Sequence, residues 1–268
     1  MVVQAETSLE SVLKRDRAVV LSGLAMVAAL AWAYIMYLAW DLQGSISMDS
    51  TQMGMAMSQT RAWSSVDFGL MYLMWAVMMT AMMVPTTAPI LLTFATVNRK
   101  RLERQQPFVP TGVFLSGYLI VWSGFALVAT LAQWSLHEAT LMTSMMGNAT
   151  PLVGGSILLA AGAFQWTPLK DVCLKRCRTP LGFIMTEWRE GPKGALTMGL
   201  RHGSFCLACC WFLMGLLFVA GVMNLLWVAA IAGYILAEKV VPAGHWLSRV
   251  AGLVLIGWGA WMVAVALA

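Results

Sequence analysis

Long apolar stretches alternate with short polar breaks along this chain. Each stretch holds about 20 residues, which is the length that an α-helix needs to cross the hydrocarbon core of a bilayer. The breaks between the stretches carry polar, basic, glycine or proline residues. This pattern predicts an all-α, polytopic transmembrane helix bundle with about seven spans. The predicted spans are residues 18–40, 67–96, 108–136, 151–168, 203–222, 225–241 and 246–268.

The basic residues lie almost entirely on one side of the predicted membrane. When residues 1–17 are placed in the cytoplasm, Arg61 is the only one of the 17 Lys and Arg residues on the outer side. Cytoplasmic loops carry an excess of Lys and Arg, so this distribution predicts a cytoplasmic N-terminus. We therefore expect a multi-pass protein of the bacterial inner (cytoplasmic) membrane.

Nothing in the sequence divides the chain into separate domains. It contains no Gly/Ser-rich linker, heptad run or low-complexity tail, so we expect a single integral membrane domain over residues 1–268. The first span is too long and too rich in Trp and Tyr for a signal peptide, and we expect it to be retained. The longest expected loops are a methionine-rich outer loop, 41–66, and a cysteine-containing cytoplasmic loop, 170–202. Within the second loop, residues 181–201 fit either an interfacial helix or a partly inserted segment.

Composition supports the membrane location and narrows the expected partners. Hydrophobic residues make up 60% of the chain and charged residues 11%, whereas soluble domains hold about 25% charged residues. The net charge of +5 comes from basic residues beside the spans, so we expect the lipid bilayer and not nucleic acid as a partner. A companion membrane or soluble subunit and a homo-oligomer stay open.

Methionine is concentrated in the outer loop. The stretch MDSTQMGMAM places Met53, Met55 and Met57 in water, where a methionine side chain has no packing to do. Thioether sulfur is a preferred ligand of the soft ion Cu(I), and it binds without losing a proton. The alternative is that the loop folds under the protein and that its methionines fill gaps.

The methionine pattern continues into the next span, MYLMWAVMMTAMMVP. At about 100° per residue, four of its methionines fall within an arc of roughly 80° on a helix. Pro85 then interrupts the span, as occurs where a helix lines a cavity or packs closely. The stripe begins at the outer surface and points inward; core packing is the alternative. The four residues are Met71, Met74, Met78 and Met82.

Cysteine is confined to the predicted cytoplasmic side. The motifs VCLKRCR and RHGSFCLACCW hold all five cysteines, and a spacing of three or four residues places side chains on one helix face. Structural disulfides are not expected on the reducing side of the membrane, and the spacings differ from those of zinc fingers and ribbons. We therefore predict a soft-metal or redox role; the alternative is that each thiol is a small buried apolar group. The candidate ligands are Cys173, Cys177, His202, Cys206, Cys209 and Cys210.

Two polar positions interrupt the later spans. Gln165 and Trp166 precede Thr167-Pro168 and mark a polar span end. Glu238 and Lys239 lie near the inner end of the sixth span, where an ionisable group indicates a functional site. The alternative is a neighbouring Glu–Lys pair whose side chains reach the interface.

Three segments together carry a family resemblance: MWAVMMTAMMVP, then QWTPLK with VCLKRCR, then GLRHGSFCLACCWFLM with GVMNLLW and AEK. In this order they resemble a bacterial family of predicted metal-binding integral membrane proteins, a domain of unknown function. The likeness covers residues 67–243 and shows no departure in the Met or Cys motifs. It implies a membrane location and a bound metal but no mechanism. The outer methionine motif is not part of the resemblance.

These observations predict a protein that handles a soft metal, with copper first and zinc or another soft metal as the alternative. Outer methionines would capture Cu(I) and pass it to cytoplasmic Cys and His residues. Thiolates bind Cu(I) more tightly than thioethers do, so this transfer needs no ATP, and no nucleotide-binding motif is present. The alternative function is a membrane subunit of a larger complex, such as a copper-dependent oxidase or monooxygenase, with a structural or cofactor-assembly role. An enzyme with a cysteine nucleophile and a small-molecule carrier are weaker alternatives.

Overall fold

The computed structural model describes residues 17–40, 63–105, 109–142 and 148–268. Within these ranges the regular structure is helical, apart from an isolated bridge between Met142 and Ala149. The predicted all-α bundle is therefore confirmed. The N-terminal helix is Arg17–Trp40. The elements after it are α2 (Ser65–Met83), η1 (Pro85–Thr87), α3 (Ala88–Glu103), α4 (Thr111–Glu138), α5 (Pro151–Phe164), α6 (Pro168–Arg178), α7 (Pro180–Glu187), α8 (Gly191–Gly215), η2 (Leu216–Phe218), α9 (Leu225–Val240) and α10 (Gly244–Leu267).

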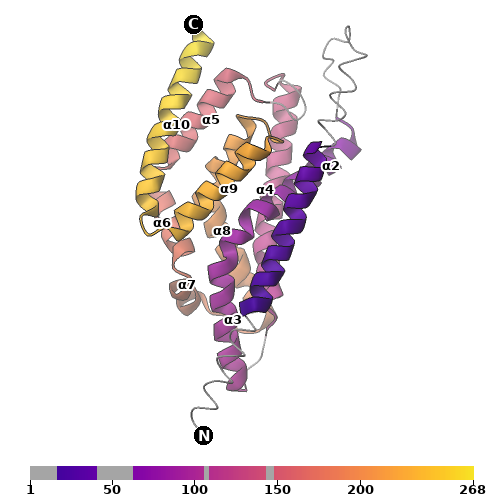
Figure 1. Ribbon diagram of the computed structural model, residues 1–268, viewed down its shortest axis with the longest axis vertical. Helices are drawn as coiled ribbons and strands as arrows, with labels where there is room; N and C mark the ends of the chain where they lie inside the picture. Colours follow the sequence, from indigo (N-terminus) through magenta and orange to yellow (C-terminus); the bar gives the residue numbers. More distant parts are fainter. Residues whose placement is uncertain (1–16, 41–62, 106–108, 143–147) are drawn as a thin grey trace.

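Most helices run along the long axis of the molecule, with α4 and α8 packed against each other and α5 packed against α10 (Figure 1). Glycines allow both close approaches. A Cβ atom added at Gly199 would overlap the carbonyl oxygen of Phe114, and one added at Gly155 would lie 3.0 Å from the carbonyl oxygen of Gly259. Small residues at helix contacts are typical of membrane bundles, where backbones pack closely.

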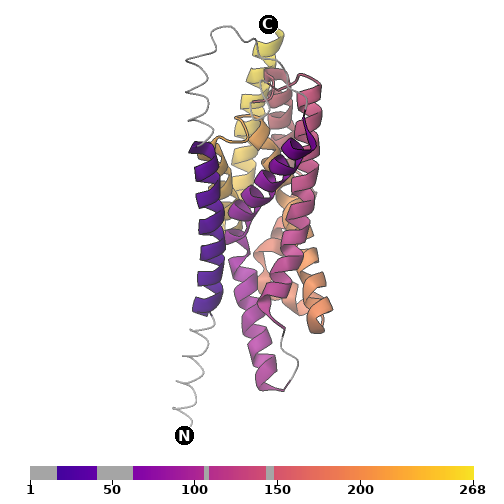
Figure 2. The ribbon, with the colours of Figure 1, turned by 90° about the vertical axis from the view of Figure 1, so that its right-hand side faces the viewer.

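The N-terminal helix flanks the bundle and contacts it through one face (Figure 2). Leu24, Ala31, Ile35 and Ala39 are buried on that face, while most of the helix is exposed. An apolar helix with so much exposed surface fits a lipid environment.

Among the described residues, five helices are long and apolar enough to cross a membrane. Helices α5 and α6, bent by 68° at their junction, pass the same test when they are taken together as a sixth span. The described residues thus hold five or six candidate spans, against a predicted number of about seven. The difference is α9, which has 16 residues between its cap Asn224 and the turn that contains Pro242. That length is below the roughly 20 residues of a full span.

The segment 170–202, predicted as a cytoplasmic loop, is helical. It forms most of α6, all of α7 and the first turns of α8, which begins twelve residues before the predicted start of its span at 203. Proline at the first or second position starts each of these helices, where its missing N–H group is not needed. Because this segment is rich in basic residues, a prediction based on hydropathy alone did not detect its helices.

Candidate metal centre

Three thiols lie inside the bundle on one face of α8. Cys206, Cys209 and Cys210 are fully buried, because the face with spacings of three and four residues points toward the neighbouring helices. Helix α6 packs against α8 and adds two further cysteines. Cys173 is buried near Cys209, and the thiol of Cys177 lies close to those of Cys206 and Cys209. All five cysteines are free thiols.

We call Cys177, Cys206, Cys209 and Cys210 the cysteine cluster. The thiols of Cys209 and Cys210 donate hydrogen bonds to the carbonyl oxygen of Cys206, at 3.1 and 2.8 Å. Among the described residues, no three His, Cys, Asp or Glu side chains are arranged around a common point that would hold a metal ion. The cluster therefore gathers soft ligands, but two of its thiols must turn away from the backbone before they can bind an ion together.

Cys206 has two polar partners from other helices. The hydroxyl of Tyr118, on α4, lies 3.1 Å from the Cys206 sulfur, and the ammonium of Lys239, on α9, lies 2.9 Å from it. Lys239 also donates to the hydroxyl of Thr86 at 3.0 Å. Tyr118 also donates to the carbonyl oxygen of Met83 at 3.2 Å. The sulfur of Cys206 is thus joined to α4, to α9 and to the end of α2.

The predicted methionine stripe lies along the buried face of α2. Its four residues belong to the same core cluster as the buried cysteines, and Met79 and Met83 lie beside them. Near the start of α2, the amide of Gln133 lies 3.9 Å from the sulfur of Met71. At the other end, α2 stops at Met83, next to the partners of Cys206. Burial suits both core packing and ligation by these residues, which are Met71, Met74, Met78 and Met82.

His202 lies one helical turn before Cys206, and its ring is enclosed by aromatic side chains. The ring centroids of Phe114, Tyr118 and Phe183 lie 6.1, 6.0 and 5.2 Å away. The Nδ1 atom of His202 is buried and has no hydrogen-bond partner among the described residues. Because buried polar atoms are usually paired, this nitrogen is available to a ligand.

Glu238 and Lys239 are neighbours in sequence, and one interpretation of the sequence was an interfacial Glu–Lys pair. In the structure their side chains have different partners. Glu238 instead forms an ion pair of 2.7 Å with Lys170, and both side chains are almost completely buried. Tyr234 and Ser248 donate to the same carboxylate, and Lys170 also donates to Gln165. The alternative of an interfacial Glu–Lys pair is therefore wrong, because these successive side chains face different partners.

Two of the residues around Cys206 were not predicted. Tyr118 and Thr86 follow no ligand pattern, and neither residue type is a soft-metal ligand. A polar group within an apolar span was the available signal. Met53, Met55 and Met57 lie outside the described residues, so their predicted role stays a prediction.

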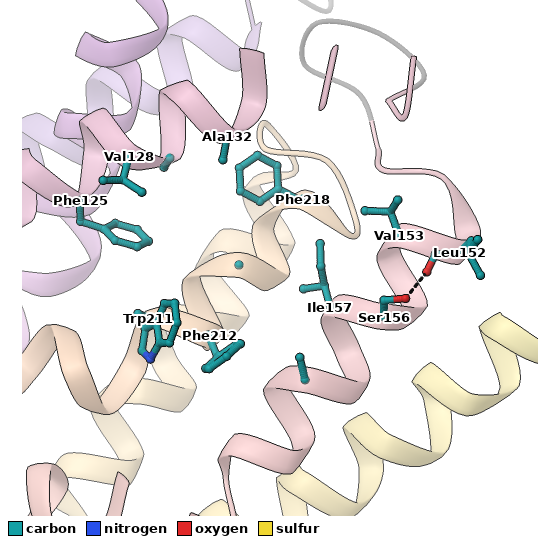
Figure 3. Close-up of a pocket in the computed structure, with 13 residues that line it drawn as sticks. Phe125, Val128, Ala132, Leu152, Val153, Ser156, Ile157, Trp211, Phe212 and Phe218 are labelled. Carbon is teal, nitrogen blue, oxygen red and sulfur yellow. Dashed lines mark hydrogen bonds between the residues drawn. The ribbon is translucent and has the colours of Figure 1, made fainter. Parts of the chain in front are cut away.

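An open apolar cavity of about 520 Å³ lies apart from the thiols, between α4, α5 and α8 (Figure 3). Aromatic and aliphatic side chains, including Phe125, Ile157 and Trp211, line it. The only hydroxyl in its lining, that of Ser156, is used in a hydrogen bond to the carbonyl oxygen of Leu152 at 2.8 Å. No sulfur atom lines this cavity, so it offers no soft ligand.

Comparison with known proteins shows a match to one protein family. The model of the PpoB2 family, described as a copper chaperone, matches residues 72–262. The match contains every member of the cysteine cluster and three methionines of the stripe, while Met71 and the outer loop precede it. No curated protein and no solved structure matches the chain.

Proposed function

The chain belongs to the PpoB2 copper chaperone family, and we propose that it is a membrane protein that passes Cu(I) from methionine thioethers to buried cysteine thiols. The stripe on α2 receives the ion from the side on which the outer loop lies. The cysteine cluster, with His202 beside it, accepts the ion at the other end of the stripe. Copper is the cargo of this protein, and no chemical reaction on a substrate is proposed.

The observation that carries this proposal is that the methionine stripe and the buried cysteines belong to one core, in which Tyr118 links the end of α2 to Cys206. Tyr118 contacts both the carbonyl oxygen of Met83 and the sulfur of Cys206, at 3.2 and 3.1 Å. Tyr118 therefore links the backbone at the end of α2, one residue after Met82, to the cysteine cluster. Residues that are about 120 positions apart in the sequence share one buried core.

The chemistry of the ligands sets the direction. Thioethers are neutral and hold Cu(I) weakly, whereas thiolates are anionic and soft and hold it more tightly. When Cu(I) moves from the stripe to two thiols, its bonds to thioether sulfur break, two Cu–thiolate bonds form and two protons leave, because the thiolate is the form that binds metal. The oxidation state of copper does not change. Transfer from the stripe to the cluster is thus downhill without an external energy source.

Cu(I) titration of the purified full-length protein in detergent, against a chromophoric Cu(I) chelator, tests the proposal. The variant with Ser at Cys206, Cys209 and Cys210 should lose high-affinity Cu(I) binding, because no pair of anionic ligands remains on α8. Met185, on α7, is exposed, so Met185→Leu serves as the matched control for loss of a sulfur ligand. In cells, the triple variant should accumulate less copper than wild type at equal expression. Equal copper content and equal Kd for the triple variant would refute the proposal.

A further inference from the structure

Cys206 has a positive charge beside its sulfur. The Lys239 ammonium lies 2.9 Å from the Cys206 sulfur and 3.0 Å from the Thr86 hydroxyl. Lys239 as a whole is half-buried, and its ammonium is directed at Cys206 and Thr86. A buried ammonium is costly unless another group compensates its charge.

No carboxylate supplies that compensation in the part of the chain that the structure describes. The ion pairs there join Arg101 to Glu190, Lys170 to Glu238, and Arg176 and Arg201 to Glu187. Glu238, the adjacent residue in sequence, forms its ion pair with Lys170 at 2.7 Å and not with Lys239. The charge of Lys239 is therefore directed at the sulfur of Cys206.

The bound state of the cluster would supply the missing negative charge. Two thiolates carry a charge of −2 and Cu(I) carries +1, so the dithiolate complex is an anion with a charge of −1. An anion of this kind is unfavourable in a low-dielectric interior unless a cation lies next to it. The ammonium of Lys239 occupies that position on Cys206.

We propose that Lys239 is the charge-compensating residue of the copper site, which makes the buried Cu(I)–dithiolate complex of Cys206 electrically neutral. This inference rests on the proposed function. Lys239 acts through the thiolate of Cys206 and is not itself a ligand, so it is a positioning residue. This role explains why the ammonium of Lys239, near the end of α9, faces the sulfur of Cys206 and the hydroxyl of Thr86 and not a carboxylate.

Cu(I) affinity measured on full-length variants in detergent tests this role. Lys239→Met removes the charge and keeps the length of the side chain. Lys239→Gln removes the charge and retains a donor for Thr86. At separations of about 4 Å, unit charges at protein-like dielectric change a binding constant by about 100-fold or more, so both variants should bind Cu(I) at least about tenfold more weakly. Lys239→Arg should bind within about threefold of wild type, because the charge is retained.

Two controls separate charge compensation from a structural role. Lys175, on α6, is exposed, so Lys175→Met removes one lysine charge from a helix of the same site and should leave the Kd unchanged. In a Cys206→Ser background, Lys239→Met should cause no further loss, because the thiolate through which it acts is missing. A purely structural lysine would weaken binding equally in both backgrounds. Thermal unfolding of each variant shows whether it is folded.

The outcomes distinguish the two proposals. If Cu(I) binding depends on the cysteines but Lys239→Met and Lys239→Gln bind as tightly as wild type, the role of Lys239 is refuted and the proposed function stands. The role of Lys239 is also refuted, and the proposed function again stands, if Lys239→Met weakens binding equally with and without Cys206. If binding does not depend on the cysteines, both proposals fail.

Discussion

The buried ion pair between Lys170 and Glu238 permits a sharp prediction about stability. The two side chains are 0% and 1% exposed, and their charged atoms lie 2.7 Å apart. They join α6, just after the bend that follows α5, to α9, and Ser248 on α10 donates to the same carboxylate. Glu238→Gln removes the negative charge and leaves the buried Lys170 ammonium with neutral acceptors, such as Gln165.

The expected cost follows from this burial. Removing one partner of a buried ion pair typically costs about 3–5 kcal/mol, because the remaining charge has no compensation. We therefore expect Glu238→Gln to lower the free energy of unfolding by about 3 kcal/mol. The double variant Lys170→Met with Glu238→Gln should recover most of this loss, since replacing both charges is often nearly neutral. The matched control is Glu190→Gln, because Glu190 is 72% exposed in its pair with Arg101 and exposed pairs contribute only about 0–1 kcal/mol.

The assay is equilibrium unfolding in mixed micelles with increasing denaturing detergent, followed by tryptophan fluorescence. The two single variants, the double variant and wild type form a double-mutant cycle, and Glu190→Gln is the external control. A loss below about 1 kcal/mol for Glu238→Gln would refute the reasoning. So would a double variant whose loss equals the sum of the two single losses, because the pair would then carry no coupling.

Three further predictions concern helix packing, the methionine stripe and a helix cap. Gly199→Ala should lower the free energy of unfolding by about 1–3 kcal/mol through overpacking, because its Cβ overlaps the carbonyl oxygen of Phe114. Gly233→Ala, at a position with nothing within 4 Å, should raise it by about 0.5–1 kcal/mol in the same assay. Met78→Leu combined with Met82→Leu should slow copper loading of the cluster by about tenfold in stopped-flow Cu(I) transfer, a change equivalent to about 1.4 kcal/mol. Met26→Leu, at an exposed position, should leave the rate unchanged. Equal rates for the double variant and wild type would show that the stripe serves core packing alone. Ser64→Ala should cost about 1 kcal/mol, since Ser64 and Asp67 form a capping box at the start of α2, and an unchanged unfolding midpoint would contradict this.

The order of ligands along the chain could be predicted because it depends on local periodicity. A helix repeats every 3.6 residues, so spacings of three and four place Met74, Met78 and Met82 on one face without any knowledge of their neighbours. The same rule places Cys206, Cys209 and Cys210 together, and the structure buries both groups in one core. The family match adds copper to this pattern, while the role of the outer methionines, within residues 41–62, remains a prediction.

The number of spans could be predicted only approximately. Hydropathy detects apolar length, but it does not detect where a helix is capped or bent. Thr167 caps α6 after a bend of 68°, and α9 is limited to 16 residues. The basic segment before residue 203 also continues the helix of the following span. These boundaries depend on capping residues and on packing, which outweigh the local apolar pattern.

The sequence by itself determined the class of fold and the faces on which sulfur ligands lie, because both follow from apolar length and helical periodicity. Only the tertiary structure decided which side chains from different helices meet. It paired Glu238 with Lys170, although Lys239 is its neighbour in sequence, and it directed Lys239 to Cys206. Successive residues on a helix point about 100° apart, so their partners depend on the register and angle of the surrounding helices. Close contacts between helices, such as those of Gly117 and Gly199 between α4 and α8, set this register and angle. No local sequence pattern specifies them.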